Sequence, residues 1–135
     1  MNVYITSTGA FLPGPAIGVD EVEDVLGKVE GQPSRLKRRI LKANGIKTRH
    51  YALGRDGRTT HSNEDMGARA GKACLEGGAL ECKDIGMLSC ATSQPDLPLP
   101  GFGSMLQARL QIPAVELVTT HGICTSGTMA LKAAL

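Results

Sequence analysis

One cysteine lies where a nucleophile is expected, between an apolar strand pattern and a helical pattern. Cys124 follows the run Val115–Thr120 and precedes a helical pattern that begins at Thr125. Gly122 and Gly127 add little bulk beside it, so the chain can turn tightly and project the cysteine over the edge of a sheet. The free N–H groups and the dipole of a helix N-terminus favour a thiolate. The same N–H groups could hold an oxyanion formed on an acyl group bound to the sulfur.

The local pattern leaves two roles open for Cys124. Most free cysteines are small buried hydrophobic residues, and that role is the alternative to the nucleophile. His121 could pair with the thiol, but at the end of a strand we expect it to pack or to form a hydrogen bond instead. We interpret His50 and His61 as structural or solvent-exposed residues. The pattern predicts where the thiol lies and does not identify what it attacks.

The other three cysteines do not fit a common metal site. Cys74, Cys82 and Cys90 form no Cys-x-x-Cys pair, and their spacings match no usual zinc ligand set. No metal and no bound cofactor are therefore predicted. The sequence shows no export signal and no apolar stretch long enough for a membrane span, so we expect a cytoplasmic protein with reduced thiols and no membrane partner.

A run of cations is the second feature that could bind a ligand. Residues 35–49 contain seven cations and no Asp or Glu: Arg35, Lys37, Arg38, Arg39, Lys42, Lys47 and Arg49. Most such runs are solvated helix faces. Without acidic neighbours, however, phosphates or an acidic partner surface are equally credible targets. The net charge of only +2 and the four aromatic residues (two Tyr and two Phe) give no support to nucleic-acid binding.

The elements that must position these residues alternate along the chain. Strands are predicted at Val3–Thr8, 46–52, 85–91 and 115–120. Helices are predicted after an Asp20 N-cap, over 34–43, from a Ser62 cap to 75, around Met105–Leu110, and from Thr125 to the last residue. This alternation predicts an α/β domain with a largely parallel sheet between helices.

Two of the predicted helices carry apolar or small-residue faces. In helix 34–43, Leu36, Ile40 and Leu41 are expected to face inward. In helix 62–75 a narrow face of small residues suits a helix pressed between close neighbours; it includes Met66, Ala70, Ala73 and Cys74. The last helical pattern reaches Leu135 without a cap. We therefore expect 1–135 to be one part of a longer protein.

Four stretches together resemble the β-ketoacyl-acyl-carrier-protein synthase III family, whose fold is thiolase-like. They are 3–13, 44–52, Cys90–Ser93 with Pro100–Gly101, and Gly122–Gly127, and they occur in the order and spacing of the family. The resemblance implies that 1–135 is the N-terminal, βαβαβ-type half of that fold. The His and Asn of the family's active site would lie in the C-terminal half, outside these residues.

The resemblance implies an acyltransferase of fatty acid or polyketide-type biosynthesis. Cys124 matches the family's nucleophile, which takes the acyl group of a primer held as a coenzyme A or phosphopantetheine thioester. Decarboxylation of malonyl-acyl carrier protein then gives a carbanion that attacks the acyl-enzyme. Without the His and Asn, we expect this chain alone to be acylated weakly at best and not to condense.

Two further site residues are implied by the resemblance. Leu99 matches a loop residue that reaches into the acyl pocket of the partner subunit of a homodimer, in which strand 115–120 would pair across the two-fold axis. Arg39 falls near a Trp that stacks on the coenzyme A adenine, and this chain has no Trp. Arg39 could stack on a base or hold a phosphate. A carrier-bound or unusual acyl primer is therefore as credible as acetyl-coenzyme A.

Two alternatives stay open. Thiolase, hydroxymethylglutaryl synthase and polyketide synthase relatives share the nucleophile, and residues beyond Leu135 would separate them. A non-catalytic partner subunit that binds carrier protein is the second alternative. Such subunits usually lack the nucleophile, so Cys124 argues against it.

Overall fold

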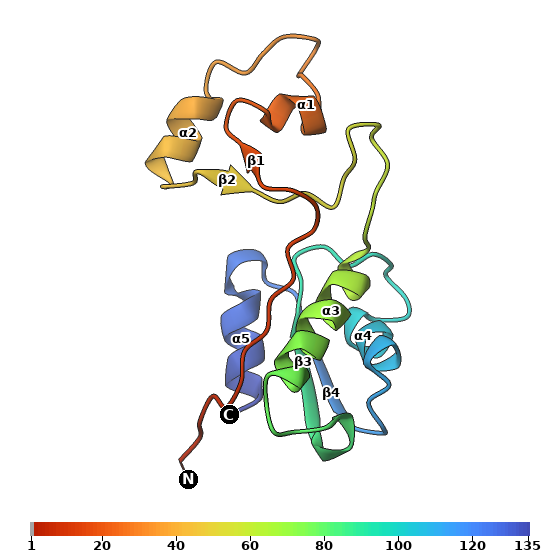
Figure 1. Cartoon of the computed structure of the whole chain (residues 1–135). Helices are drawn as coiled ribbons and strands as arrows, with labels where there is room; N and C mark the ends of the chain where they lie inside the picture. Colours follow the sequence, from red (N-terminus) through yellow and green to blue (C-terminus); the bar gives the residue numbers. More distant parts are fainter. Residues whose placement is uncertain (1) are drawn as a thin grey trace. The chain divides into compact units, whose positions relative to one another are not determined.

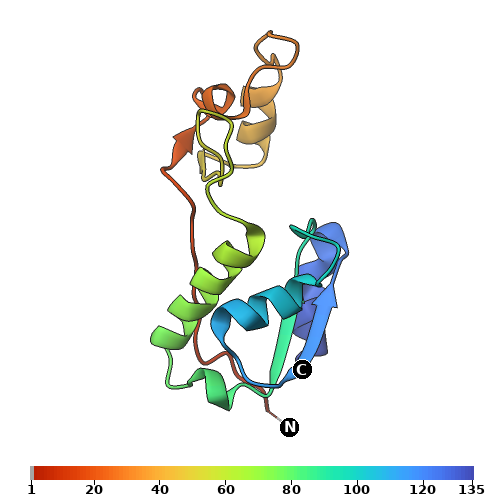
Figure 2. The same cartoon turned by 90° about the vertical axis from the view of Figure 1, so that its right-hand side faces the viewer.

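A computed structural model describes residues 2–135. The chain divides into two compact units (Figures 1 and 2). The first comprises the segment up to Phe11 together with Asn63–Leu135, and the second comprises Leu12–Ser62. In the part of the chain that the structure describes, no helix has the length and apolar character needed to cross a membrane.

Two parallel strands form the centre of the first unit. Strand β3 (Met87–Ala91) pairs with β4 (Glu116–Thr120). Helix α4 (Phe102–Leu110) lies between them in sequence and supplies the crossover that a parallel pair requires. The predicted strands at 85–91 and 115–120, and the parallel sheet between helices, are confirmed.

Helix α5 (Ser126–Ala133) covers one face of this strand pair. Successive side chains of a strand point to opposite faces, and Ser89 of β3 points toward α5. Its Oγ donates a hydrogen bond to the Ala130 carbonyl oxygen over 2.7 Å. In the views of Figures 1 and 2, α5 lies on one side of β3 and β4, and α4 lies on the other.

Helix α4 covers the opposite face at very short range. Cys90 of β3 is buried against Phe102 and Leu106 of α4. Gly103 lies so close to β4 that an added Cβ would come within 2.6 Å of Thr119 Oγ1. The Gly103 N–H donates to that same hydroxyl over 3.2 Å. A residue with a side chain at this position would push the helix off the sheet.

Helix α3 (Asn63–Glu76) packs on α4 through small residues. Gly67 and Gly71 lie one helical turn apart, and a Cβ at either would lie 3.2 Å from a side-chain carbon of Leu106 or Leu110. These two glycines therefore let the leucines of α4 approach the α3 backbone. The prediction of a helix with a narrow, tightly packed face is confirmed, although the residues that face α4 are glycines.

The predicted strand at Val3–Thr8 is wrong. Residues 2–11 form neither helix nor strand, and the segment runs along α3. There, Ser7 Oγ donates to the Cys74 carbonyl oxygen over 2.6 Å, and a Cβ at Gly9 would collide with the Cys74 backbone. The alternating sequence suits a strand, but a strand needs a partner, and no strand within residues 2–135 pairs with this segment.

The second unit contains a short antiparallel pair and two short helices. Strand β1 (Ile17–Gly18) pairs with β2 (Thr48–Arg49), so the predicted extended segment 46–52 is a strand at only two residues. Helix α1 (Val22–Leu26) ends at Gly27 as predicted, with a φ of 80° that glycine tolerates. Helix α2 (Lys37–Ala43) is shorter than the predicted 34–43.

Two predictions for the second unit are wrong. Asp20 does not cap α1, because Glu21 occupies the N-cap position and the Asp20 carboxylate pairs with Arg38 instead. Leu36 and Ile40 do not face a core, since they are 49% and 50% exposed. A unit this small has too little interior to bury a whole helix face.

Helix α3 is capped by a distant carboxylate. Asp96, in the loop before α4, accepts hydrogen bonds from the backbone N–H of Asn63 (2.8 Å) and of Glu64 (3.0 Å). Burial would raise the pKa of Asp96, but these hydrogen bonds outweigh it and hold the pKa below its ordinary value. More than thirty residues separate the cap from the helix, so local spacing could not predict it.

The Asp96 cap predicts a pH-dependent contribution to stability. Asp96→Asn should lower the free energy of unfolding by about 1 kcal/mol, because the amide can accept only one of the two hydrogen bonds and carries no charge to interact with the helix dipole. Because the native pKa is depressed, the carboxylate stabilises fully above the unfolded pKa of about 4, and this contribution is lost as pH falls through the native pKa. Urea unfolding at pH 7 and at lower pH would measure it. Glu116→Gln, at an exposed carboxylate, is the control, and a loss in Asp96→Asn that does not shrink at low pH would contradict the cap.

Candidate functional site

Cys124 lies in a tight turn between β4 and α5. Strand β4 ends at Thr120, the 3₁₀ turn η2 (Ile123–Thr125) follows, and α5 begins at Ser126. The Cys124 side chain is exposed. The structure therefore excludes, within residues 2–135, the alternative that Cys124 is a buried packing residue. The thiol lies at the start of a helix, where the sequence predicts it.

The backbone just before Cys124 adopts a left-handed conformation. Ile123 has a φ of 50°, which is rare for a β-branched residue. At Gly122, an added Cβ would lie 2.9 Å from Thr125 Oγ1, so a side chain there would displace the Thr125 hydroxyl. A strained residue of this kind costs roughly 1–3 kcal/mol and persists only where its surroundings hold it. Such strain is typical of turns that present a nucleophile.

Three hydroxyl groups hold the strained turn. Thr125 Oγ1 donates to the Gly122 carbonyl oxygen over 2.8 Å, and Ser126 Oγ donates to the Ile123 carbonyl oxygen over 2.7 Å. From the end of β4, Thr120 Oγ1 donates to the Ser126 carbonyl oxygen over 2.9 Å. Ser126 is buried, with 5% of its surface exposed. The turn is thus fastened at its first residue, at its strained residue and at the first residue of α5.

The backbone N–H of Cys124 is a free donor beside the sulfur. In η2, the N–H groups of Thr125 and Ser126 donate to Gly122 and Ile123. Among residues 2–135, no hydrogen bond uses the N–H of Cys124. Unpaired N–H groups are expected at the start of a helix. An acyl group on the sulfur would bring its carbonyl oxygen near this donor, as one part of an oxyanion hole requires.

The histidines take no part in this turn. His121 is exposed, and its ring forms no hydrogen bond within the described residues, so its predicted packed or hydrogen-bonded role is wrong. It is not bonded to Cys124 either. The strand ends one residue earlier and lets the ring project outward. His50 has a structural contact, with Nδ1 3.0 Å from the Gly14 carbonyl oxygen. His61 Nδ1 lies 3.0 Å from Thr60 Oγ1.

Cys90 shows the opposite environment from Cys124. It is 5% exposed in the core between β3 and α4, and burial raises the pKa of its thiol. Cys82 Sγ donates to the Leu110 carbonyl oxygen over 3.3 Å. Across residues 2–135, no group of three or more His, Cys, Asp and Glu side chains could hold a metal ion. Cys124 is the exposed one of the four thiols.

The other two predicted site residues are exposed. Leu99, in the loop before α4, is 83% exposed and belongs to the first unit, as Cys124 does. Arg39 is exposed on α2 of the second unit. Their roles stay predictions.

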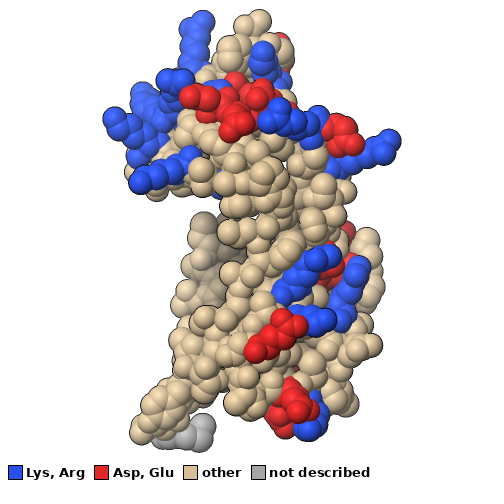
Figure 3. Space-filling model, viewed as in Figure 1, with Lys and Arg blue, Asp and Glu red and all other residues tan. Residues whose placement is uncertain are grey.

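Two cations of the run at 35–49 have acidic partners outside the run. Lys37 Nζ lies 2.7 Å from Glu23 Oε2, and an Arg38 nitrogen lies 2.6 Å from Asp20 Oδ1. The hydrogen bond from Lys37 is the main cause of a lowered pKa of Glu23. Both acidic residues come from α1 or the turn before it, which is why spacing within the run could not show them. Figure 3 shows the Lys and Arg side chains gathered where α2 lies.

Comparison with known proteins shows what the chain is similar to. No protein-family model matches it. It is 32% identical, over 131 residues, to the β-ketoacyl-[acyl-carrier-protein] synthase III of Cereibacter sphaeroides. The match covers 97% of this chain and 37% of that protein. The chain therefore spans little more than a third of the length of this curated relative.

Solved structures give the same result. A tetronic acid condensing enzyme is 25% identical with a TM-score of 0.83, and the match covers 98% of this chain and 40% of that one. The 3-oxoacyl-[acyl-carrier-protein] synthase III of Aquifex aeolicus has a TM-score of 0.78 at 22% identity, with 98% and 39% covered. The predicted resemblance to the β-ketoacyl-acyl-carrier-protein synthase III family and the thiolase-like α/β fold class are confirmed.

The contrast between Cys124 and Cys90 predicts selective alkylation. Iodoacetamide should modify Cys124 faster than Cys90, by a factor on the order of ten or more. The reason is that the Cys124 thiol is exposed in the folded chain and the Cys90 thiol is buried. Peptide mapping by mass spectrometry over a time course would measure both rates. In denaturant the two rates should converge. Equal rates in the folded chain would show that the turn does not present the thiol as described.

The hydrogen bond from Ser126 predicts an effect on the turn itself. Ser126→Ala should cost about 1–2 kcal/mol of stability, because it removes a buried donor to the strained Ile123 carbonyl. It should also change the alkylation rate of Cys124, since the turn is released at its strained residue. Thr128→Ala, at an exposed helix position, is the matched control. If Cys124 is alkylated in Ser126→Ala at the same rate as in the wild type and in Thr128→Ala, Ser126 does not hold the turn.

Proposed function

We propose that this chain is the nucleophile-bearing part of an acyltransferase that condenses an acyl thioester primer with malonyl-acyl carrier protein. The observation that carries the proposal is the exposed Cys124 in a strained strand-to-helix turn, beside its own free N–H. The names of the similar proteins, a β-ketoacyl-acyl-carrier-protein synthase III and a tetronic acid condensing enzyme, support this class of reaction.

The first step is acylation of Cys124. Its thiolate attacks the carbonyl carbon of the primer thioester, and the Cys124 N–H donates to the oxyanion that forms. The intermediate collapses with loss of the primer's thiolate, from coenzyme A or phosphopantetheine. A new thioester then joins the acyl group to Cys124 Sγ. The exposed sulfur and the fastened backbone support this step, because attack requires an accessible atom held in one place.

The second step is carbon–carbon bond formation. Malonyl-acyl carrier protein loses carbon dioxide, and the resulting carbanion attacks the acyl carbon on Cys124. The Cys124 thiolate leaves, and a β-ketoacyl thioester remains on the carrier. The groups that stabilise the carbanion are expected beyond these residues. This chain's own part is to carry the acyl group and to bind its carbonyl oxygen.

A homodimer is proposed through the sheet. Within residues 2–135, β4 pairs only with β3, so its outer edge keeps unpaired backbone groups. An open edge is a template for another strand. Leu99, exposed on its loop, would then enter the acyl pocket of the partner subunit and limit the length of the primer. Arg39 would contact a phosphate or the base of the primer's carrier group.

An acylation assay tests the proposal. Full-length protein incubated with an acyl thioester should gain one acyl mass increment, and peptide mapping should locate it on Cys124. Cys124→Ala should abolish the increment because the attacking sulfur is gone. Cys74→Ala, at a half-buried thiol, should leave it unchanged. Label on another cysteine would refute Cys124 as the nucleophile. No label while iodoacetamide still modifies Cys124 would refute acyl transfer and favour a non-catalytic partner subunit.

A further inference from the structure

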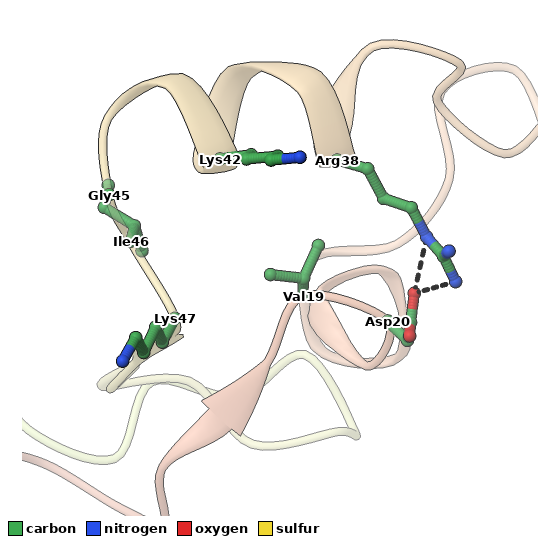
Figure 4. A pocket seen from close by; sticks show the side chains of 7 residues that line it. All are labelled: Val19, Asp20, Arg38, Lys42, Gly45, Ile46 and Lys47. Atoms are coloured by element: carbon green, nitrogen blue, oxygen red, sulfur yellow. Dashed lines mark hydrogen bonds and ion pairs between the residues drawn. The ribbon is translucent and has the colours of Figure 1, made fainter.

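A hollow with cationic walls lies in the second unit, which contains neither Cys124 nor Leu99. It has a volume of about 460 Å³ and lies between α2 and the turn that joins β1 to α1 (Figure 4). The residues that line it are Val19, Asp20, Arg38, Lys42, Gly45, Ile46 and Lys47. Arg39 is not among them. The position that the family resemblance assigns to a carrier group, Arg39, follows Arg38 on α2 but does not line the hollow.

The path of the chain brings two lysines to the same hollow. Lys42 lies in the last turn of α2, and the chain then reverses at Gly45, whose φ of 68° suits glycine. Lys47 returns along the other wall, just before β2. Figure 4 shows the two lysines on different elements, with their ammonium ends directed apart. Both residues are exposed and form no ion pair within the described residues, so each side chain is free to turn toward a ligand.

The charges of the hollow are not balanced. Arg38 is paired with Asp20, so those two residues contribute no net charge. Within the described residues, Lys42 and Lys47 form no ion pair, and the lining as a whole has an excess of two positive charges. The negative end of the α2 dipole offsets part of the Lys42 charge. Lys42 alone is therefore a weak anion site.

The remaining wall is apolar. Val19 and Ile46 line the hollow, and both are only half-buried. A ligand that matches these features has an apolar body and an end group with more than one negative charge. A phosphate monoester fits, because it carries between one and a half and two negative charges at pH 7. A simple carboxylate would neutralise only one of the two lysines.

We propose that this hollow binds a phosphate monoester with an apolar body, with the exposed side chains of Lys42 and Lys47 turning toward the phosphate and the body against Val19 and Ile46. The proposal does not depend on acyl transfer at Cys124. The rival occupant is an acidic segment of a partner protein. Such a segment would be attracted by all the cations of α2, including those outside the hollow.

Binding of hexyl phosphate to the full chain tests the proposal. Titration followed by amide chemical shifts should move the signals of Gly45 and Ile46, and hexyl phosphate should bind more tightly than inorganic phosphate or hexanol. Lys42→Gln and Lys47→Gln should each weaken binding about two- to fivefold, the range of exposed ion pairs. Arg35→Gln, in the same run but outside the hollow, should leave binding unchanged. Added salt should weaken binding of the wild type.

Three results would overturn the proposal. Equal weakening by Arg35→Gln would show a diffuse attraction to the whole run and not a site. Binding of inorganic phosphate as tight as that of hexyl phosphate would remove the role of the apolar wall. Tighter binding of a hexaglutamate peptide than of hexyl phosphate, lost in the same two lysine variants, would assign the hollow to an acidic protein partner. None of these results would bear on the proposed acylation of Cys124.

Discussion

The first unit depends on how the chain passes from β4 into α5. Five residues in an extended strand and eight in a helix are joined by a turn that forces a β-branched residue into the left-handed region. This arrangement holds because α5 is tied to the sheet at two points one helical turn apart. Thr120 binds the Ser126 carbonyl, and Ser89 binds the Ala130 carbonyl. The turn cannot relax unless the helix leaves the sheet.

Close packing by small residues makes that attachment rigid. Gly103 lets the α4 backbone reach the hydroxyl of Thr119, while Gly67 and Gly71 let α3 approach α4. A chain with four aromatic residues has few large side chains to fill gaps. The layers therefore approach each other closely at glycines, which have no side chain. In this arrangement Cys90 is buried between β3 and α4, and Cys124 is exposed.

The sequence predicted what depends on local pattern. A continuous apolar run predicted β3, and Val115–Thr120 predicted β4. The glycines and the helical pattern around Cys124 located the turn and the exposed thiol. Features that depend on distant partners were missed or wrong. Val3–Thr8 has the pattern of a strand without a strand to pair with. Asp96 caps a helix more than thirty residues away, and no rule of spacing connects the two.

The prediction that the cations of residues 35–49 lack acidic partners was wrong for the same reason. These cations appear unpaired in sequence, yet Glu23 of α1 and Asp20 of the turn before it form ion pairs with two of them. The hollow beside Lys42 and Lys47 was invisible in the sequence, since it depends on a chain reversal at Gly45. The roles of Leu99 and Arg39 rest on family resemblance alone.

The discontinuity of the first unit has an evolutionary consequence. The chain leaves that unit after Phe11, whose ring lies 5.1 Å from the Arg69 guanidinium on α3, and re-enters it at Asn63, where α3 begins. Both crossing points are anchored to the same helix. Residues 12–62 are therefore an excursion whose ends are fixed, and such segments tolerate insertion, deletion and exchange. Lineages could remodel this excursion, and with it ligand preference, while the scaffold around the sulfur is inherited unchanged.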